Sequence, residues 1–107
     1  MIIEERRIAF SREAVMAAVG LFAKPCSVAL PPGDIVGVEA EDGGCQLQVA
    51  PAGGEALQSL TVEPGAVTSM LILYASRQGI PIQKRGDKTL ERAADGLTLN
   101  IRLESQG

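Results

Sequence analysis

The chain of 107 residues contains no histidine. Histidine is the side chain whose ordinary pKa lies closest to neutral pH, and it is the commonest general base in enzymes. Neither cysteine therefore has an imidazole partner, and no serine stands in a nucleophile-elbow pattern. The glycines match neither of the two phosphate-binding fingerprints. We therefore predict a protein that is not an enzyme and that uses no metal and no cofactor.

Aromatic side chains are scarce as well: there is no tryptophan, and the aromatic residues are Phe10, Phe22 and Tyr74. A core must then be built from Val, Leu, Ile and Ala. Proteins that bind single-stranded nucleic acids usually stack the bases on aromatic rings. The formal net charge of −3 also argues against a broadly basic surface for nucleic acids or membranes. Nucleic acid is disfavoured as a partner without being ruled out, and no membrane partner is expected.

Cysteine is limited to Cys26 and Cys45. Small extracellular domains carry more cysteines at regular spacings, so two reduced thiols are favoured over a disulfide. The first residues include acids in place of the basic start and apolar stretch of a secretion signal. The longest strongly apolar run, residues 67–75, is too short to cross a bilayer. These observations predict a cytoplasmic protein.

The length fits a single domain over residues 1–107, and a hydrophobic content of 46% suffices for its core. In the first half, Ile8 and Phe10 alternate with polar or small residues as in a strand. Ser11 is a candidate N-cap for a helix that ends before Pro25. Apolar residues within 35–38 and 47–49 predict a pair of strands.

The second half shows the same order of elements. Residues 60–62 predict a strand, Pro64 suits the first position of a helix, and Gly79 suits its C-terminal cap. Residues 88–91 and 97–101 predict two further strands. The order β-α-β-β therefore occurs twice.

The two β-α-β-β units align without gaps at an offset of 52 residues, as pseudo-repeats over about 6–50 and 58–104. Identical residues at matched positions include Val15 and Val67, Ala23 and Ala75, Gly44 and Gly96, and Leu47 and Leu99. We predict an internal duplication; the alternative is that common packing constraints produced two similar units. The predicted fold is α+β, with a mainly antiparallel sheet and two helices on one face.

The predicted second helix is apolar nearly all round over residues 70–74. A helix of this kind is buried on more than one side. In so small a domain the additional cover can come from a second subunit. We therefore expect a homodimer whose interface buries Ile72 and Leu73.

The densest cluster of charge is a basic loop that contains Lys84, Arg85 and Lys88. Arg77 and Arg92 flank it along the chain. Such side chains beside a glycine can hold a phosphate or a carboxylate. The alternative, which we favour, is a solvated loop with exposed ion pairs of little energetic weight.

Glu39 and Glu91 occupy matched positions in the two pseudo-repeats. If they lay together across a pseudo-twofold axis, the two carboxylates could do acid–base work or bind a hard cation. Acids at the ends of strands are more often simply exposed, and we favour that interpretation.

The stretch from Met70 through Gly79-Ile80-Pro81-Ile82, followed by Lys88-Thr89-Leu90-Glu91 and Gly96-Leu97-Thr98-Leu99, resembles a group of short uncharacterised alphaproteobacterial proteins. They share a helix, an Ile-Pro-Leu-Pro-Arg-like turn and a Lys-x-x-Glu-like strand, and here Gln83 replaces the second proline of that turn. The resemblance covers about a third of the chain. It implies a bacterial cytoplasmic origin and brings no catalytic or ligand-binding role.

These observations favour a non-catalytic protein-interaction or regulatory module that acts as a homo-oligomer. The alternative function is binding of an anion or a nucleic acid through the basic loop at residues 84–88.

Overall fold

The computed structural model describes residues 1–41, 44–54 and 56–105, which form two helices and six strands. In chain order these are β1 (Ile2–Ser11), α1 (Arg12–Phe22), β2 (Asp34–Glu41), β3 (Gly44–Ala50), β4 (Gln58–Val62), α2 (Pro64–Arg77), β5 (Asp87–Ala93) and β6 (Gly96–Ser105). The predicted α+β class and the antiparallel pairing of the strands are confirmed.

The six strands form two three-stranded sheets, whereas the sequence predicted one mainly antiparallel sheet. The first sheet has the order β1-β6-β5 and the second has the order β2-β3-β4. Each hairpin, β2–β3 or β5–β6, is completed by the first strand of the other half of the chain. The halves are therefore interlocked, and each sheet contains strands from both.

The registers of the two sheets coincide at the predicted offset of 52 residues. The pair Ile8↔Leu99 between β1 and β6 corresponds to the pair Leu60↔Leu47 between β4 and β3. In the two hairpins, the pair Gly37↔Gln48 corresponds to the pair Thr89↔Asn100, and each following pair toward the turn corresponds in the same way. The correspondence ends at a register shift in β2 between Ile35 and Gly37. An internal duplication would produce this agreement; the duplication itself stays a prediction.

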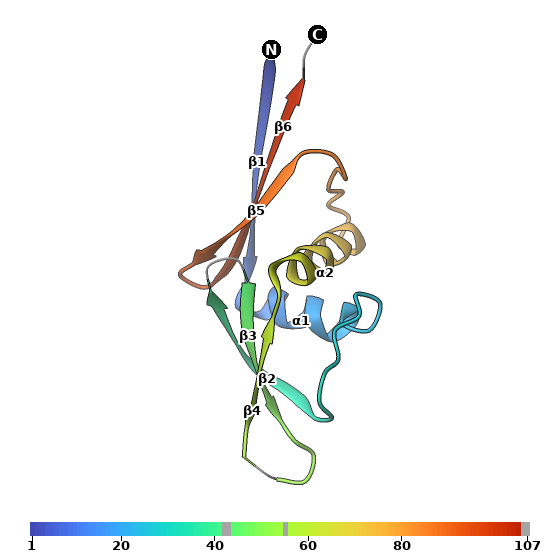
Figure 1. Ribbon diagram of the computed structural model, residues 1–107, viewed down its shortest axis with the longest axis vertical. Coiled ribbons are helices and arrows are strands. Elements are labelled where there is room, and N and C mark those ends of the chain that lie inside the picture. The colour runs from blue at the N-terminus through green and yellow to red at the C-terminus, as the bar shows by residue number, and fades with distance from the viewer. Residues whose placement is uncertain (42–43, 55, 106–107) are drawn as a thin grey trace.

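The molecule is elongated and measures 58 × 25 × 20 Å along its principal axes. Figure 1 shows the two helices side by side on one side of the sheets, as predicted. The start of β1 and the end of β6 lie at one end, and the end of β3 and the start of β4 lie toward the other. Helix α1 packs against α2, β2 and β6, while α2 also packs against β3 and β5.

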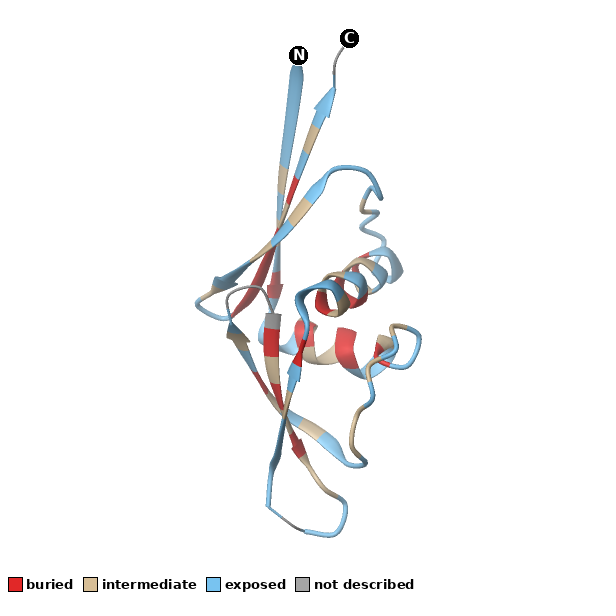
Figure 2. Cartoon of the chain, in the orientation of Figure 1, coloured by how far each residue is buried: buried red, intermediate tan, exposed pale blue. Residues whose placement is uncertain are grey.

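The core is mainly aliphatic, with Phe10 among its members, and lies between the helices and the inner faces of the sheets (Figure 2). On β3, Cys45, Leu47 and Val49 are buried while Gln46 and Gln48 face the other way. This alternation is that of a strand with one face on the core. The largest fully buried side chains are Leu47, Met70, Leu71, Leu97 and Leu99.

The helix boundaries follow local chemistry. The Ser11 hydroxyl accepts a hydrogen bond of 3.1 Å from the backbone N–H of Ala14, so Ser11 is the N-cap of α1 as predicted. Pro64 stands at the start of α2, and Gly79 follows its end in the left-handed region with φ +85°.

Gly96 lies where β6 begins between β1 and β5, with φ +129°. A Cβ atom at this position would overlap the carbonyl oxygen of Phe10. We expect Gly96→Ala to lower the free energy of unfolding by about 2 kcal/mol or more, because the substitution adds both backbone strain and a clash with backbone.

The matched control is Gly20→Ala. A Cβ atom on Gly20, which is exposed in α1, meets nothing within 4 Å. This change should raise the free energy of unfolding by up to about 1 kcal/mol, because alanine favours helix over glycine. Urea unfolding measures both variants, and equal stabilities would contradict this account of Gly96.

Candidate functional site

The basic loop joins α2 to β5, and one of its three central cations faces inward. The Lys88 ammonium donates to the backbone carbonyl oxygens of Lys84 at 2.9 Å and of Arg85 and Gly86 at 3.4 Å each. Gly86, with φ +98° in the left-handed region that favours glycine, directly precedes the start of β5. Lys88 thus serves to close the loop, while the side chains of Lys84 and Arg85 are exposed.

The other two cations of the predicted group lie elsewhere. Arg77 is in the last turn of α2, where a positive charge interacts favourably with the helix dipole. Arg92 lies on β5 four residues beyond Lys88, which corresponds to about 13 Å along an extended strand. The structure therefore brings together Lys84, Arg85 and Lys88, and it separates Arg92 from them.

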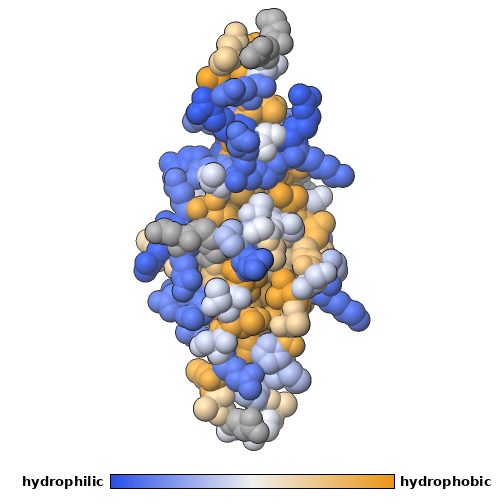
Figure 3. Space-filling view, viewed as in Figure 1, coloured by the Kyte–Doolittle hydropathy of each residue, from blue (hydrophilic) through white to orange (hydrophobic). Residues whose placement is uncertain are grey.

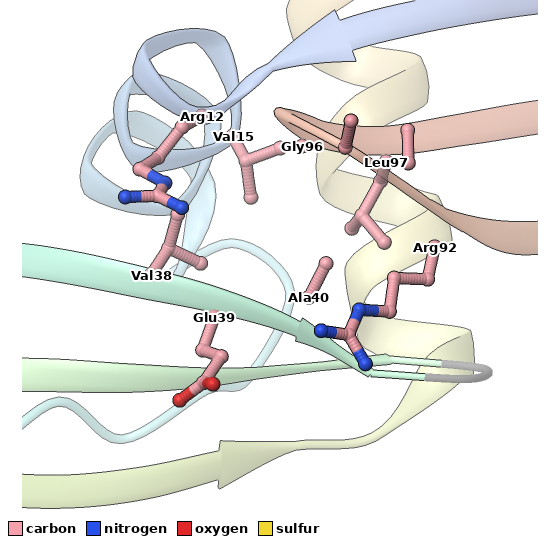
Figure 4. A pocket seen from close by; sticks show the side chains of 10 residues that line it. Arg12, Val15, Val38, Glu39, Ala40, Arg92, Gly96 and Leu97 are labelled. Atoms are coloured by element: carbon pink, nitrogen blue, oxygen red, sulfur yellow. The ribbon is translucent and has the colours of Figure 1, made fainter.

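Arg92 instead borders a small cavity of about 140 Å³ between α1, β2 and the β5–β6 hairpin. Figure 4 shows Arg12 reaching the cavity from the start of α1 and Arg92 reaching it from the opposite side. Glu39 on β2 lies at the edge of the same cavity. The volume corresponds to about five water molecules and is below the usual size of a ligand pocket, about 300 Å³.

Glu39 and Glu91 do not line a common site. Glu39 lies at this cavity, whereas Glu91 lies in an open hollow on the outer face of the first sheet. There the Glu91 carboxylate forms an exposed ion pair of 3.3 Å with Arg7. Within residues 1–41, 44–54 and 56–105, no group of three or more acidic or cysteine side chains is arranged to hold a metal ion.

Both cysteines are free thiols. Burial raises the pKa of the fully buried Cys45 thiol to about 11, with a smaller contribution from the Glu41 carboxylate. At neutral pH this thiol stays protonated, and a protonated thiol is a poor nucleophile. Cys45 therefore acts as a core residue.

Helix α2 is covered mainly by its own chain. Val67, Met70 and Leu71 are buried, and Ile72 is half-buried. Leu73 is exposed, with a relative solvent exposure of 40%. The cover that the sequence led us to expect from a second subunit is thus supplied in large part by α1, β3 and β5.

The sequence did not reveal a projecting ribbon at the end of the first sheet. The predicted strand began near residue 6, but β1 begins at Ile2 and pairs with β6 as far as Ser105. The third strand, β5, extends only to the pair Asp87↔Arg102. Residues 2–4 and 103–105 therefore form a two-stranded extension, which we call the ribbon (Figure 1).

The ribbon was missed because residues 4–7 are four consecutive charged residues, which hide the alternation of a strand. Neither helix in the described part of the chain has the length and apolar content needed to cross a bilayer. Comparisons with family models, curated proteins and solved structures gave no match.

We expect Lys88→Met to lower the free energy of unfolding by about 1 kcal/mol, because the loop carbonyls lose a charged donor while the aliphatic stem remains. Lys84→Met is the matched control and should change stability by less than about 0.5 kcal/mol, because its side chain is exposed. Thermal unfolding measures both. Equal effects would contradict the role assigned to the Lys88 ammonium.

Proposed function

We propose that this domain is a non-catalytic protein-interaction or regulatory module that acts as a homo-oligomer. The observation that carries the proposal is the ribbon, which extends beyond Asp87, the first residue of β5, with Ile2 and Ile3 exposed. A two-stranded ribbon has little stability of its own in water, and it gains stability when a further strand or an apolar surface covers it. The ribbon is therefore suited to contact another chain.

The outer surface of the helices gives further support. Leu21 on α1, Leu73 on α2 and Ile80 in the loop after α2 are each exposed by 40% or more. Figure 3 shows apolar surface over the middle of the molecule, where the helices lie. The interface predicted at Ile72 and Leu73 belongs to this region. Exposed apolar patches on small domains commonly mark contacts with other proteins.

Within this proposal the domain works in the bacterial cytoplasm. A reducing compartment keeps free thiols such as Cys26 and Cys45 from forming disulfides. The bacterial origin rests on the resemblance of residues 70–99 to alphaproteobacterial proteins.

Anion or nucleic-acid binding through residues 84–88 stays a prediction. It would depend on Lys84 and Arg85, because the Lys88 ammonium already contacts three carbonyl oxygens. No observation favours it over self-association.

The proposal is tested by sedimentation equilibrium over a wide range of protein concentrations. We expect reversible self-association, and a chain that stays monomeric throughout would contradict the proposal. An Ile72→Ser/Leu73→Ser variant then locates the interface, with Ser69→Ala on the exposed side of α2 as its control. Loss of association in the double variant assigns the interface to α2, and retention assigns it to another surface.

A further inference from the structure

β1 is the longest of the four strands that lie at sheet edges. It has ten residues, against eight in β2, seven in β5 and five in β4. β2 is further interrupted by its register shift. Edge strands have unpaired N–H and C=O groups and serve as templates for another strand, unless they are short, bulged or covered. β1 is neither short nor bulged along the ribbon, and its protection against unrelated strands is the run of charged residues 4–7.

The exposed part of β1 carries apolar side chains. Residues 2–5 are all exposed, and the relative solvent exposures of Ile2 and Ile3 are 67% and 46%. Further along the strand, Ile8 is half-buried and Phe10 belongs to the core. Ile2, Ile8 and Phe10 lie on the same face of β1, because they are separated by even numbers of residues.

The charges of β1 have a self-complementary order. Two acids, Glu4 and Glu5, are followed directly by two bases, Arg6 and Arg7. When a second copy of this strand runs antiparallel to the first, its bases come to lie beside the acids of the first copy. Opposite charges on facing strands stabilise a pair, and like charges destabilise it.

Antiparallel geometry restricts the register. Along a strand, the N–H and C=O groups of every second residue point to the same edge. In an antiparallel pair, two directly opposed residues either both point these groups at each other or both point them away. A strand therefore pairs with its own copy only when one residue lies opposite itself at the centre. Only two such central residues, Glu5 and Arg6, bring an acid of one copy opposite a base of the other.

We propose that β1 pairs antiparallel with β1 of a second copy of this chain, with Glu5 at the twofold centre. Glu4 then lies opposite Arg6 of the second copy, and Ile2 lies opposite Ile8, each twice by symmetry. This interface rests on the proposed function and supplies its homo-oligomer. The two first sheets become one six-stranded sheet with the order β5-β6-β1-β1-β6-β5.

The surroundings of β1 favour Glu5 over Arg6 as the centre. The two Glu5 side chains that meet at the axis each have Arg102 as cross-strand neighbour on β6. Both centres oppose two like charges at the axis and place a charged residue opposite an isoleucine, Arg7 opposite Ile3 for the Glu5 centre and Glu4 opposite Ile8 for the Arg6 centre. Two opposed Arg6 side chains, however, have Ile101 as their cross-strand neighbour on β6, which carries no compensating charge. A centre at Arg6 would also require Ile2 to reach Phe10, which is buried within the body of the molecule.

Arg6 has a polar contact within its own chain. Its guanidinium donates a hydrogen bond of 3.2 Å to the carbonyl oxygen of Pro81 in the loop after α2. Glu4 is exposed and forms no ion pair among the described residues. The self-complementary charges select a second copy over an unrelated strand, because an unrelated strand would have to match the order acid-acid-base-base by chance.

The test uses two single variants of the full chain, Glu4→Lys and Arg6→Glu. Each variant alone places like charges opposite each other on both sides of the axis, so its dissociation constant should rise by at least about tenfold. In a heterodimer of the two variants, opposite charges are restored at both pairs between residues 4 and 6, so an equal mixture should associate as wild type does. Sedimentation equilibrium of each variant and of the mixture measures this.

A second measurement does not depend on the Arg6 variant. Under mild oxidation, Glu5→Cys should form an intermolecular disulfide, because residue 5 lies opposite itself. Glu4→Cys should not form this disulfide. The wild-type chain serves as the control, because it shows any crosslinking that comes from Cys26 and Cys45. Wild-type association that persists in both charge variants, without crosslinking of Glu5→Cys, overturns this interface and leaves the proposed function standing. A wild-type chain that never associates overturns both.

Discussion

The exchange of first strands between the two halves is the constraint on which the whole structure depends. β1 completes the sheet of the β5–β6 hairpin, and β4 completes the sheet of the β2–β3 hairpin. Each hairpin is covered on its inner face by helices from both halves. Neither half therefore has all the strands of one sheet, and the core can close only when both are present. Gly96 shows how tightly this exchange is packed, because the backbone of β6 runs directly against the end of β1.

Local chemistry made most of the elements predictable. Ser11, Pro64 and Gly79 have the roles at helix ends that their types favour, and the alternation in β3 identified a strand with one buried face. In β6 the alternating Leu97, Leu99 and Ile101 are buried as expected, but Thr98 between them is buried as well. The exchange of strands was not predictable, because the apolar face of β1 at Ile8 and Phe10 suits either hairpin. Alternation shows which face of a strand is buried, but it carries no information about which strand pairs with it.

The same limit explains the candidate sites. Closeness in sequence grouped Arg92 with the basic loop, but an extended strand carries it about 13 Å from Lys88. The inward orientation of Lys88 depends on backbone carbonyls that only the folded loop brings together. The ribbon, in contrast, emerges from pairing between residues at opposite ends of the chain. The feature that best supports a function is thus a consequence of topology, and the charges of residues 4–7 acquire meaning only once β1 is known to be an edge strand.

The most direct test of this account is to prepare residues 1–53 and 54–107 as separate chains and to mix them. Circular dichroism, amide dispersion and sedimentation would be measured for each half and for the mixture. The exchange of strands predicts that neither half folds alone as a monomer and that mixing yields a folded one-to-one complex with cooperative unfolding. A half that folds by itself as a monomer with a complete three-stranded sheet would contradict the interlocked topology.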